Sequence, residues 1–137
     1  GTGRIYGIEA YGYNHYFEGN YIRYHTGPGM HLGGLVNSTI SGGTNYWEIR
    51  ENQLDGIALL NFSGYPDTSN VTITGIRVNS NSWTGIKVQP NGYGNITGIV
   101  IQNTASVSGN GLYQDGEVCR VVGTGVTSDI PVHIGCN

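Results

Sequence analysis

Short alternations of apolar and polar residues recur along this chain at nearly constant intervals. In one series of segments the central residues are Ile22, Ile49, Ile76 and Ile99, so the intervals are 27, 27 and 23 residues. Alternation with a period of two is typical of a β-strand with one buried face. A repeat of this length that contains several short strands predicts a solenoid, in which equivalent residues of successive coils lie above one another.

A second series of segments begins at a glycine. Its members are Gly29-Met-His-Leu32, Gly56-Ile-Ala-Leu59, Gly85-Ile-Lys-Val88 and Gly111-Leu-Tyr-Gln114, with an earlier Gly7-Ile-Glu-Ala10 and a later Ile130-Pro-Val-His-Ile134. We expect a sharp turn at each glycine, where an unhindered backbone is needed. Two series with one period predict an all-β chain, a parallel β-helix of about five to six coils of roughly 22–29 residues. The alternative is an antiparallel sandwich, although the hairpins of a sandwich do not require a sequence repeat of about 27 residues.

These segments resemble the right-handed parallel β-helix proteins of the pectate-lyase-like superfamily. The resemblance is carried by Asn70-Val-Thr-Ile-Thr-Gly-Ile-Arg-Val-Asn, Thr84-Gly-Ile-Lys-Val-Gln and Asn95-Ile-Thr-Gly-Ile-Val-Ile-Gln-Asn, and it extends as a repeat pattern over roughly residues 5–135. It implies the fold rather than the activity, because the superfamily includes lyases, hydrolases, epimerases, tailspikes and adhesins. Residues 1–137 then form one domain, complete or the C-terminal part of a longer β-helix, and 118–137 form a closing coil.

Composition narrows the functional classes. The net charge of −3 argues against a general nucleic-acid binder, and no apolar run is long enough to span a membrane. With 24 glycines, a helical bundle is also disfavoured. Four Asn-X-Ser/Thr sequons suit a secreted or cell-surface protein, although a chain of this composition also forms sequons by chance. The candidate glycosylation sites are Asn37, Asn61, Asn70 and Asn95.

In a β-helix the residue after each central isoleucine points outward, which predicts a column of Arg23, Arg50, Arg77 and Val100. Guanidinium groups about 5 Å apart repel one another, so the row needs counter-charges or an anionic ligand. Two interpretations stay open. The row is either a solvated set of pairs with Glu48 and Glu51 or a groove for an acidic polysaccharide, whose carboxylates guanidinium binds bidentately.

Two more columns follow from the same alignment. The residues His25, Asn52, Asn79 and Gln102 are predicted to form an amide ladder at a turn. The outward positions of the second series are Glu9, His31, Ala58, Lys87, Tyr113 and His133. Because this second column mixes hydrogen-bonding and stacking groups, we add His31, Lys87 and Tyr113 to the arginines as candidate substrate-binding residues.

Catalytic groups are less evident. Paired carboxylates are needed for glycoside hydrolysis, and the weak candidates are Asp55, Asp115 and Glu117. The polygalacturonase pattern departs here, since Leu54-Asp55-Gly56 and Gly85-Ile-Lys87 contain no aspartate pair. The histidines lack metal-ligand spacing and no acid cluster suggests Ca²⁺, so no metal or cofactor is predicted. Cys119 and Cys136 are expected to form a disulfide worth about 3 kcal/mol on the chain-entropy estimate.

The sequence therefore predicts an extracellular β-helix module that binds a polysaccharide, most naturally an acidic one. If it is an enzyme, it is a polysaccharide lyase or a glycoside hydrolase. The competing hypothesis is a non-catalytic structural or adhesive solenoid that stacks end to end or forms homo-oligomers. Aromatic residues crowd the first coils, and they suit a cap, a sugar-stacking surface or a subunit contact. They are Tyr6, Tyr11, Tyr13, Tyr16, Phe17, Tyr21 and Tyr24.

Overall fold

The computed structural model describes residues 5–45, 47–103, 106–111, 118–121 and 123–135, and within them it contains strands and no helix. No helix in these ranges is long and apolar enough to cross a membrane. The strands are β1 (Ile8–Tyr13), β2 (Tyr16–Glu18), β3 (Ile22–Arg23), β4 (Met30–Ser41), β5 (Glu48–Arg50), β6 (Ile57–Leu60), β7 (Ser69–Thr74), β8 (Arg77–Asn79), β9 (Ile86–Gln89), β10 (Thr97–Gln102), β11 (Ser106–Ser108), β12 (Val118–Arg120), β13 (Val126–Ser128) and β14 (Val132–Ile134).

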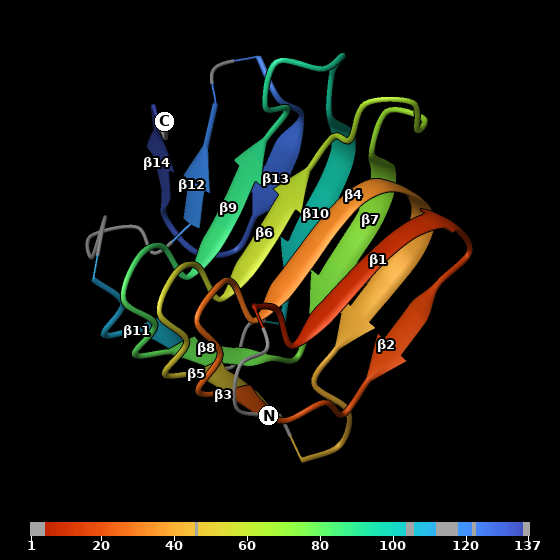
Figure 1. Ribbon diagram of the computed structural model, residues 1–137. Helices are drawn as coiled ribbons and strands as arrows, with labels where there is room; N and C mark the ends of the chain where they lie inside the picture. The colour runs from red at the N-terminus through yellow and green to blue at the C-terminus, as the bar shows by residue number, and fades with distance from the viewer. Residues whose placement is uncertain (1–4, 46, 104–105, 112–117, 122, 136–137) are drawn as a thin grey trace.

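The described strand pairs are all parallel and form two sheets. The larger sheet has the order β13-β10-β7-β4-β6-β9-β12-β14, with β1 and β2 also paired to β4, and the smaller has the order β11-β8-β5-β3. The long strand β4 pairs with β6 over residues 30–33 and with β7 over residues 36–41. Between these two stretches Gly34 has a φ of 60°, and the sheet changes direction there (Figure 1).

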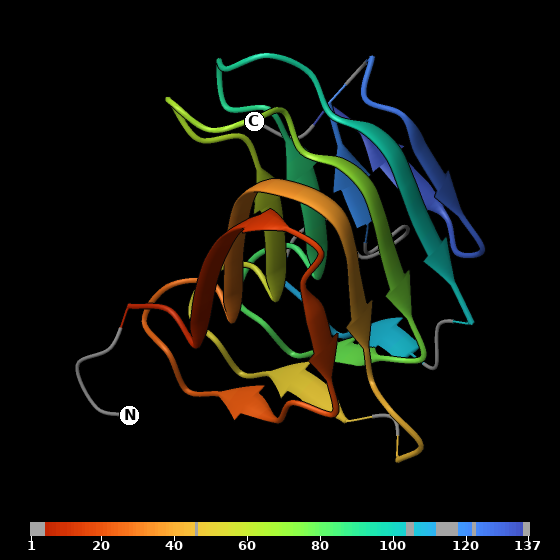
Figure 2. The same ribbon diagram turned by 90° about the vertical axis from the view of Figure 1, so that its right-hand side faces the viewer.

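The larger sheet is therefore divided into two faces, and the smaller sheet is a third. The first face comprises residues 8–10 and 30–33 with β6, β9, β12 and β14. The second comprises β2, residues 36–41, β7, β10 and β13, and the third comprises β3, β5, β8 and β11. From β1 to β12 the chain visits the faces in the order first, second, third and then returns to the first, and after β13 on the second face it goes directly to β14 on the first. This recurrence and the parallel pairing are compatible with a parallel β-solenoid that nearly encloses its core (Figure 2), and they argue against the antiparallel sandwich.

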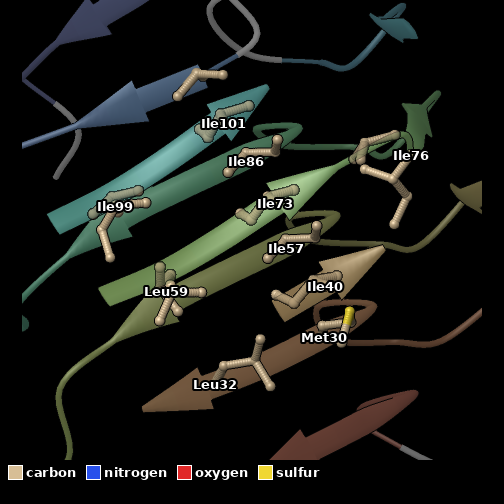
Figure 3. Packing of buried hydrophobic residues seen from close by; sticks show 14 of the residues in the cluster. Met30, Leu32, Ile40, Ile57, Leu59, Ile73, Ile76, Ile86, Ile99 and Ile101 are labelled. Atoms are coloured by element: carbon tan, nitrogen blue, oxygen red, sulfur yellow. The ribbon is translucent and has the colours of Figure 1, made fainter. Parts of the chain in front are cut away.

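Aliphatic side chains stack in rows inside this shell. Along the first face Met30 pairs with Ile57, which pairs with Ile86, and along the second face Ile40 pairs with Ile73. Figure 3 shows these rows side by side. All five side chains are at most 1% exposed, and each contributes about 1.5–3 kcal/mol by leaving water. The repeat of apolar residues in the sequence therefore becomes a continuous core.

The first predicted column is only partly right. Ile22 does pair with Ile49, but Ile49 then pairs with Val78 rather than with Ile76. Ile99 belongs to β10 on the second face, where it pairs with residue 71. The error at Ile76 has a physical cause: a shift of two residues leaves the alternation of buried and exposed side chains unchanged, so the apolar pattern alone does not choose between the two registers.

Buried asparagines form a hydrogen-bonded ladder in the strand register that the structure shows. The Nδ2 group of Asn52 donates to Asn81 Oδ1 at 3.0 Å, and Asn81 Nδ2 donates to Asn110 Oδ1 at 3.0 Å. Each of the three side chains is at most 1% exposed, and Asn52 Oδ1 accepts a hydrogen bond from the backbone of His25. The predicted amide ladder is thus confirmed at His25 and Asn52, whereas its other two members are wrong. Asn79 lies on the outer surface instead, and Gln102 is exposed at the end of β10.

The glycines of the second series are needed for close packing rather than for a sharp turn. Gly29 and Gly56 do not have the positive φ of a left-handed residue. A Cβ added at Gly56 would lie 2.3 Å from Val78 Cγ1 and 2.7 Å from the carbonyl oxygen of Gly85. The same crowding surrounds Gly29, against Ile49 Cγ2 and the Gly56 carbonyl. Glycine is therefore required because the first and third faces approach each other closely here.

Candidate functional site

The outer surface of the first face carries the second predicted column almost as expected. Glu9 pairs with His31, His31 with Ala58 and Ala58 with Lys87, so these neighbours are confirmed. The next position is Cys119, which pairs with both Lys87 and His133. Tyr113 had been expected at that position, and it lies outside the described residues. Successive strands thus present a carboxylate, an imidazole, a methyl group and an ammonium group in a row.

A cleft of about 260 Å³ lies over this row. Ala58, between His31 and Lys87 on neighbouring strands, also lines the cleft, although the residue is only 1% exposed. The walls include residues that precede the strands as well as residues within them. The side chains used below are Tyr6, His31, Asp55, Ala58, Trp83 and Lys87.

An ion pair fixes one side of the cleft. Lys87 Nζ lies 3.1 Å from Asp55 Oδ2, and the two side chains are 16% and 2% exposed. The other carboxylate oxygen accepts a hydrogen bond from the Thr84 N–H at 3.1 Å, and the ammonium lies 6.0 Å from the centroid of the Trp83 ring. A buried pair with satisfied oxygens holds its groups in one orientation. Polar contacts are therefore preorganised beside an exposed indole.

His31 forms the other side. Its Nδ1 lies 2.9 Å from Glu9 Oε2, and its ring stacks flat on Tyr6, with centroids 4.2 Å apart and an interplanar angle of 4°. A second cleft of about 300 Å³ begins on the far side of this imidazole and is lined by Glu9, Tyr11, His31, Phe62 and Tyr65. Because His31 lines both clefts, the two form one extended surface rather than isolated hollows.

This surface combines aromatic faces with oriented polar groups. Aromatic faces beside oriented polar groups are typical of sugar sites. Each carboxylate has a basic partner, since Glu9 contacts His31 and Asp55 contacts Lys87. Asp55 is thus part of the site, while the other two catalytic candidates, Asp115 and Glu117, lie outside the described residues.

The predicted row of three arginines is broken. Arg23 does pair with Arg50, but Arg77 pairs with Glu48 and the position beside Arg50 is Asn79. The Nη1 atoms of Arg50 and Arg77 each lie 3.9 Å from a Glu48 carboxylate oxygen. The cause is the same two-residue shift in register that displaced Ile76.

The counter-charges on the third face favour the structural interpretation of this row. Arg50 Nε lies 3.2 Å from Glu51 Oε2. Arg23 lies over the ring of Tyr24 at 4.2 Å and donates to the Tyr21 hydroxyl at 2.6 Å; this hydrogen bond raises the pKa of the guanidinium above its ordinary value. Two of the three arginines thus contact glutamate, which matches the solvated row of ion pairs.

The sequons differ in accessibility. Asn61 is 2% exposed, and its Nδ2 donates to the backbone oxygens of Tyr93 at 2.5 Å and Asn95 at 2.8 Å, so a glycan on Asn61 is incompatible with this fold. Asn37 and Asn70 are exposed neighbours joined by a hydrogen bond of 2.7 Å, and Asn95 is also exposed. These three remain candidate sites.

The remaining predictions concern metals and cysteines. Among the residues that the structure describes, no group of three or more His, Cys, Asp or Glu side chains could hold a metal ion. Cys119 is fully buried and is not a free thiol. Cys136 lies outside the described residues, so its pairing with Cys119 stays a prediction.

No protein-family model, curated protein or solved structure matches this chain.

Proposed function

We propose that this chain is a secreted or cell-surface module, a right-handed parallel β-helix of pectate-lyase-like architecture, that binds a polysaccharide along the outer surface of its first face. The observation that carries the proposal is the cleft lined by His31 and Lys87, which brings an exposed indole next to an oriented Asp55–Lys87 pair. The indole stacks on a sugar ring while the charged pair hydrogen-bonds hydroxyl groups.

The extended form of the surface supports a polymer over a single sugar. The second cleft continues from the first at His31 and adds Tyr65 and Phe62 as further stacking groups. Neighbouring strands lie about 4.8 Å apart, so a ligand that crosses the row from Glu9 to Lys87 follows regularly spaced contacts. Repeating contacts of this kind suit a repeating ligand.

The charge of the cleft favours a neutral polysaccharide over the acidic one expected from the sequence. The two clefts hold two carboxylates, Glu9 and Asp55, and one ammonium group, Lys87, so no excess of positive charge lies there. The three-arginine row was the main reason to expect an acidic ligand, and only Arg23 and Arg50 remain adjacent. A polyuronate is therefore tested beside neutral polysaccharides, and its binding would weaken as the salt concentration rises.

The test is binding of a panel of soluble polysaccharides, neutral and acidic, measured by affinity electrophoresis and calorimetry. Trp83→Ala removes the stacking indole of the cleft, and Trp47→Ala is the matched control because that residue is similarly exposed, at 42% against 45%, and lies beside the third face. We expect Trp83→Ala to raise Kd about tenfold or more, which corresponds to roughly 1.4 kcal/mol. Equal losses in both variants, or no ligand in the panel, would count against the cleft.

An adhesive or structural solenoid is the second candidate, favoured by the exposed end formed by β1 and β2. Phe17 of β2 is only partly buried against the core, and Tyr13 and Tyr16 are 61% and 63% exposed. Sedimentation velocity at increasing concentration separates the two candidates. Growth into long assemblies, without glycan binding, supports the structural role.

A further inference from the structure

Two tyrosines from distant parts of the chain meet on the outer surface. Tyr11 lies on β1, and Tyr65 lies in the segment between β6 and β7. Their ring centroids are 4.5 Å apart with an interplanar angle of 48°, and the residues are 50% and 44% exposed. The centroid separation is close to that of two phenol rings joined by one carbon–carbon bond.

The contact is held in place by the chain around it. A hydrogen bond to the Tyr11 side chain raises the pKa of Tyr65 above its ordinary value, and the Tyr65 backbone N–H donates to the Phe62 carbonyl at 3.2 Å in a tight turn. Beneath the loop, a Cβ at Gly34 would lie only 2.6 Å from Tyr65 Cβ. The loop therefore lies directly on β4, and this close approach brings its tyrosine to β1.

We propose that Tyr11 and Tyr65 are a site of oxidative modification, at which a peroxidase and hydrogen peroxide join the two rings as an intramolecular dityrosine. Each phenol loses one electron and one proton to give a phenoxyl radical. The radicals couple through ring carbons ortho to the oxygens, and the hydrogen on each coupled carbon then moves to the oxygen and restores the phenol. One carbon–carbon bond forms, two hydrogens are lost in all, and one peroxide is reduced to two molecules of water.

Proximity makes this coupling intramolecular. Radical pairs on separate molecules must first collide, whereas Tyr11 and Tyr65 are already in contact and experience a very high effective concentration of one another. Exposure gives the oxidant access to both rings. Tyr13 and Tyr16 are more exposed still, yet no ring contact is seen for either among the residues that the structure describes. They are therefore the natural comparison residues.

The modification would join the first strand to a loop that follows β6, and it does not depend on polysaccharide binding. The link would cross from β1 over β4 to the loop and enclose residues 11–65 in a covalent ring. A constraint of that length restricts the unfolded chain much as a long disulfide loop does. Such a link would raise resistance to heat and proteolysis in an oxidising extracellular setting.

The experiment treats dilute full-length protein with a peroxidase and hydrogen peroxide. The readouts are dityrosine fluorescence, the intact mass of the monomer and mapping of linked peptides. We expect a monomer lighter by two hydrogens, a linkage between Tyr11 and Tyr65, and a higher melting temperature. Tyr65→Phe should remove at least nine-tenths of the monomer fluorescence, while the matched Tyr13→Phe should leave it unchanged.

Other outcomes overturn the proposal. Dityrosine found only in covalent dimers would show that exposed tyrosines couple by collision. A monomer linkage that persists in Tyr65→Phe, or one that maps to other tyrosines, would assign the modification elsewhere. Absence of dityrosine in the wild-type protein would mean that the contact is not competent for coupling. Circular dichroism of the Phe variants confirms that each is folded, and Tyr11→Phe provides an independent second test.

Discussion

Removing one rung of the asparagine ladder should destabilise the protein far more than removing an asparagine two residues away. Asn81 is 1% exposed. Its Oδ1 accepts from the backbone N–H and the Nδ2 of Asn52, and its Nδ2 donates to Ile49 O, Asn79 O and Asn110 Oδ1, at 3.0–3.3 Å. Truncation leaves the buried Asn52 N–H without its acceptor. Counting about 1 kcal/mol for each of the two side-chain ladder bonds, to Asn52 and to Asn110, and about 1–3 kcal/mol for the orphaned buried group, Asn81→Ala should cost about 3–5 kcal/mol.

Asn79→Ala is the matched control. Its Oδ1 accepts from Ser106 Oγ and from the N–H and Oγ of Ser108 at 3.1–3.2 Å, but the last two contacts are exposed, and water can replace what is lost. We expect a cost of about 1 kcal/mol.

Urea unfolding monitored by circular dichroism measures both variants. With an m-value of roughly 2 kcal/mol/M, the midpoints should fall by about 2 M for Asn81→Ala and by about 0.5 M for Asn79→Ala. Equal shifts, or a larger shift for Asn79→Ala, would refute the register in which residues 52, 81 and 110 stack.

Three further predictions follow from buried contacts. Gly56→Ala places a methyl group against Val78 and the Gly85 carbonyl, and it should cost about 2–3 kcal/mol in urea unfolding; a neutral result would mean that the first and third faces are farther apart. Lys87→Met leaves the Asp55 carboxylate buried without its cation and should cost about 3 kcal/mol, most of which Asp55→Asn should restore in the double variant; additive losses would contradict this coupling. In a glycosylating host, peptide mapping should find Asn61 unmodified, since its amide nitrogen is buried and bonded, and a glycan there would contradict the fold.

The second series was predictable because its signal is independent of side-chain alternation. A glycine at each strand start marks one position per repeat, and crowding around Gly29 and Gly56 tolerates no other residue. The order of the outward-facing residues from Glu9 to Lys87 is therefore the order that the sequence predicts.

The first series failed because its signal was only alternation. The repeated Ile-Arg pairs predict that Ile22, Ile49 and Ile76 stack, yet strands two residues out of register show the same pattern of buried and exposed side chains. A better signal was present: His25, Asn52 and Asn81 each precede a glycine of the second series by four residues. Alignment on that spacing gives the observed ladder and places Arg77 outside the arginine row.

The cleft was predictable only in part. The sequence predicts His31 and Lys87 on one surface, and in the structure both line one cleft. The partnership of Lys87 with Asp55 was missed, because the carboxylate belongs to the turn before β6 and reaches a lysine one coil further on. Contacts between columns depend on side-chain reach across the turn, which a repeat pattern does not encode.

The central claim is that successive repeats stack in parallel, with fixed partners. Backbone nuclear Overhauser effects on isotopically labelled protein measure this most directly. We predict contacts that link Val71 to Ile99 and Ile73 to Ile101, which is the order of a parallel pair. A further contact should link Ile40 to Ile73 across the next parallel pair. The reversed order, with Val71 beside Ile101 and Ile73 beside Ile99, would show antiparallel strands and contradict the fold, the ladder and the cleft together.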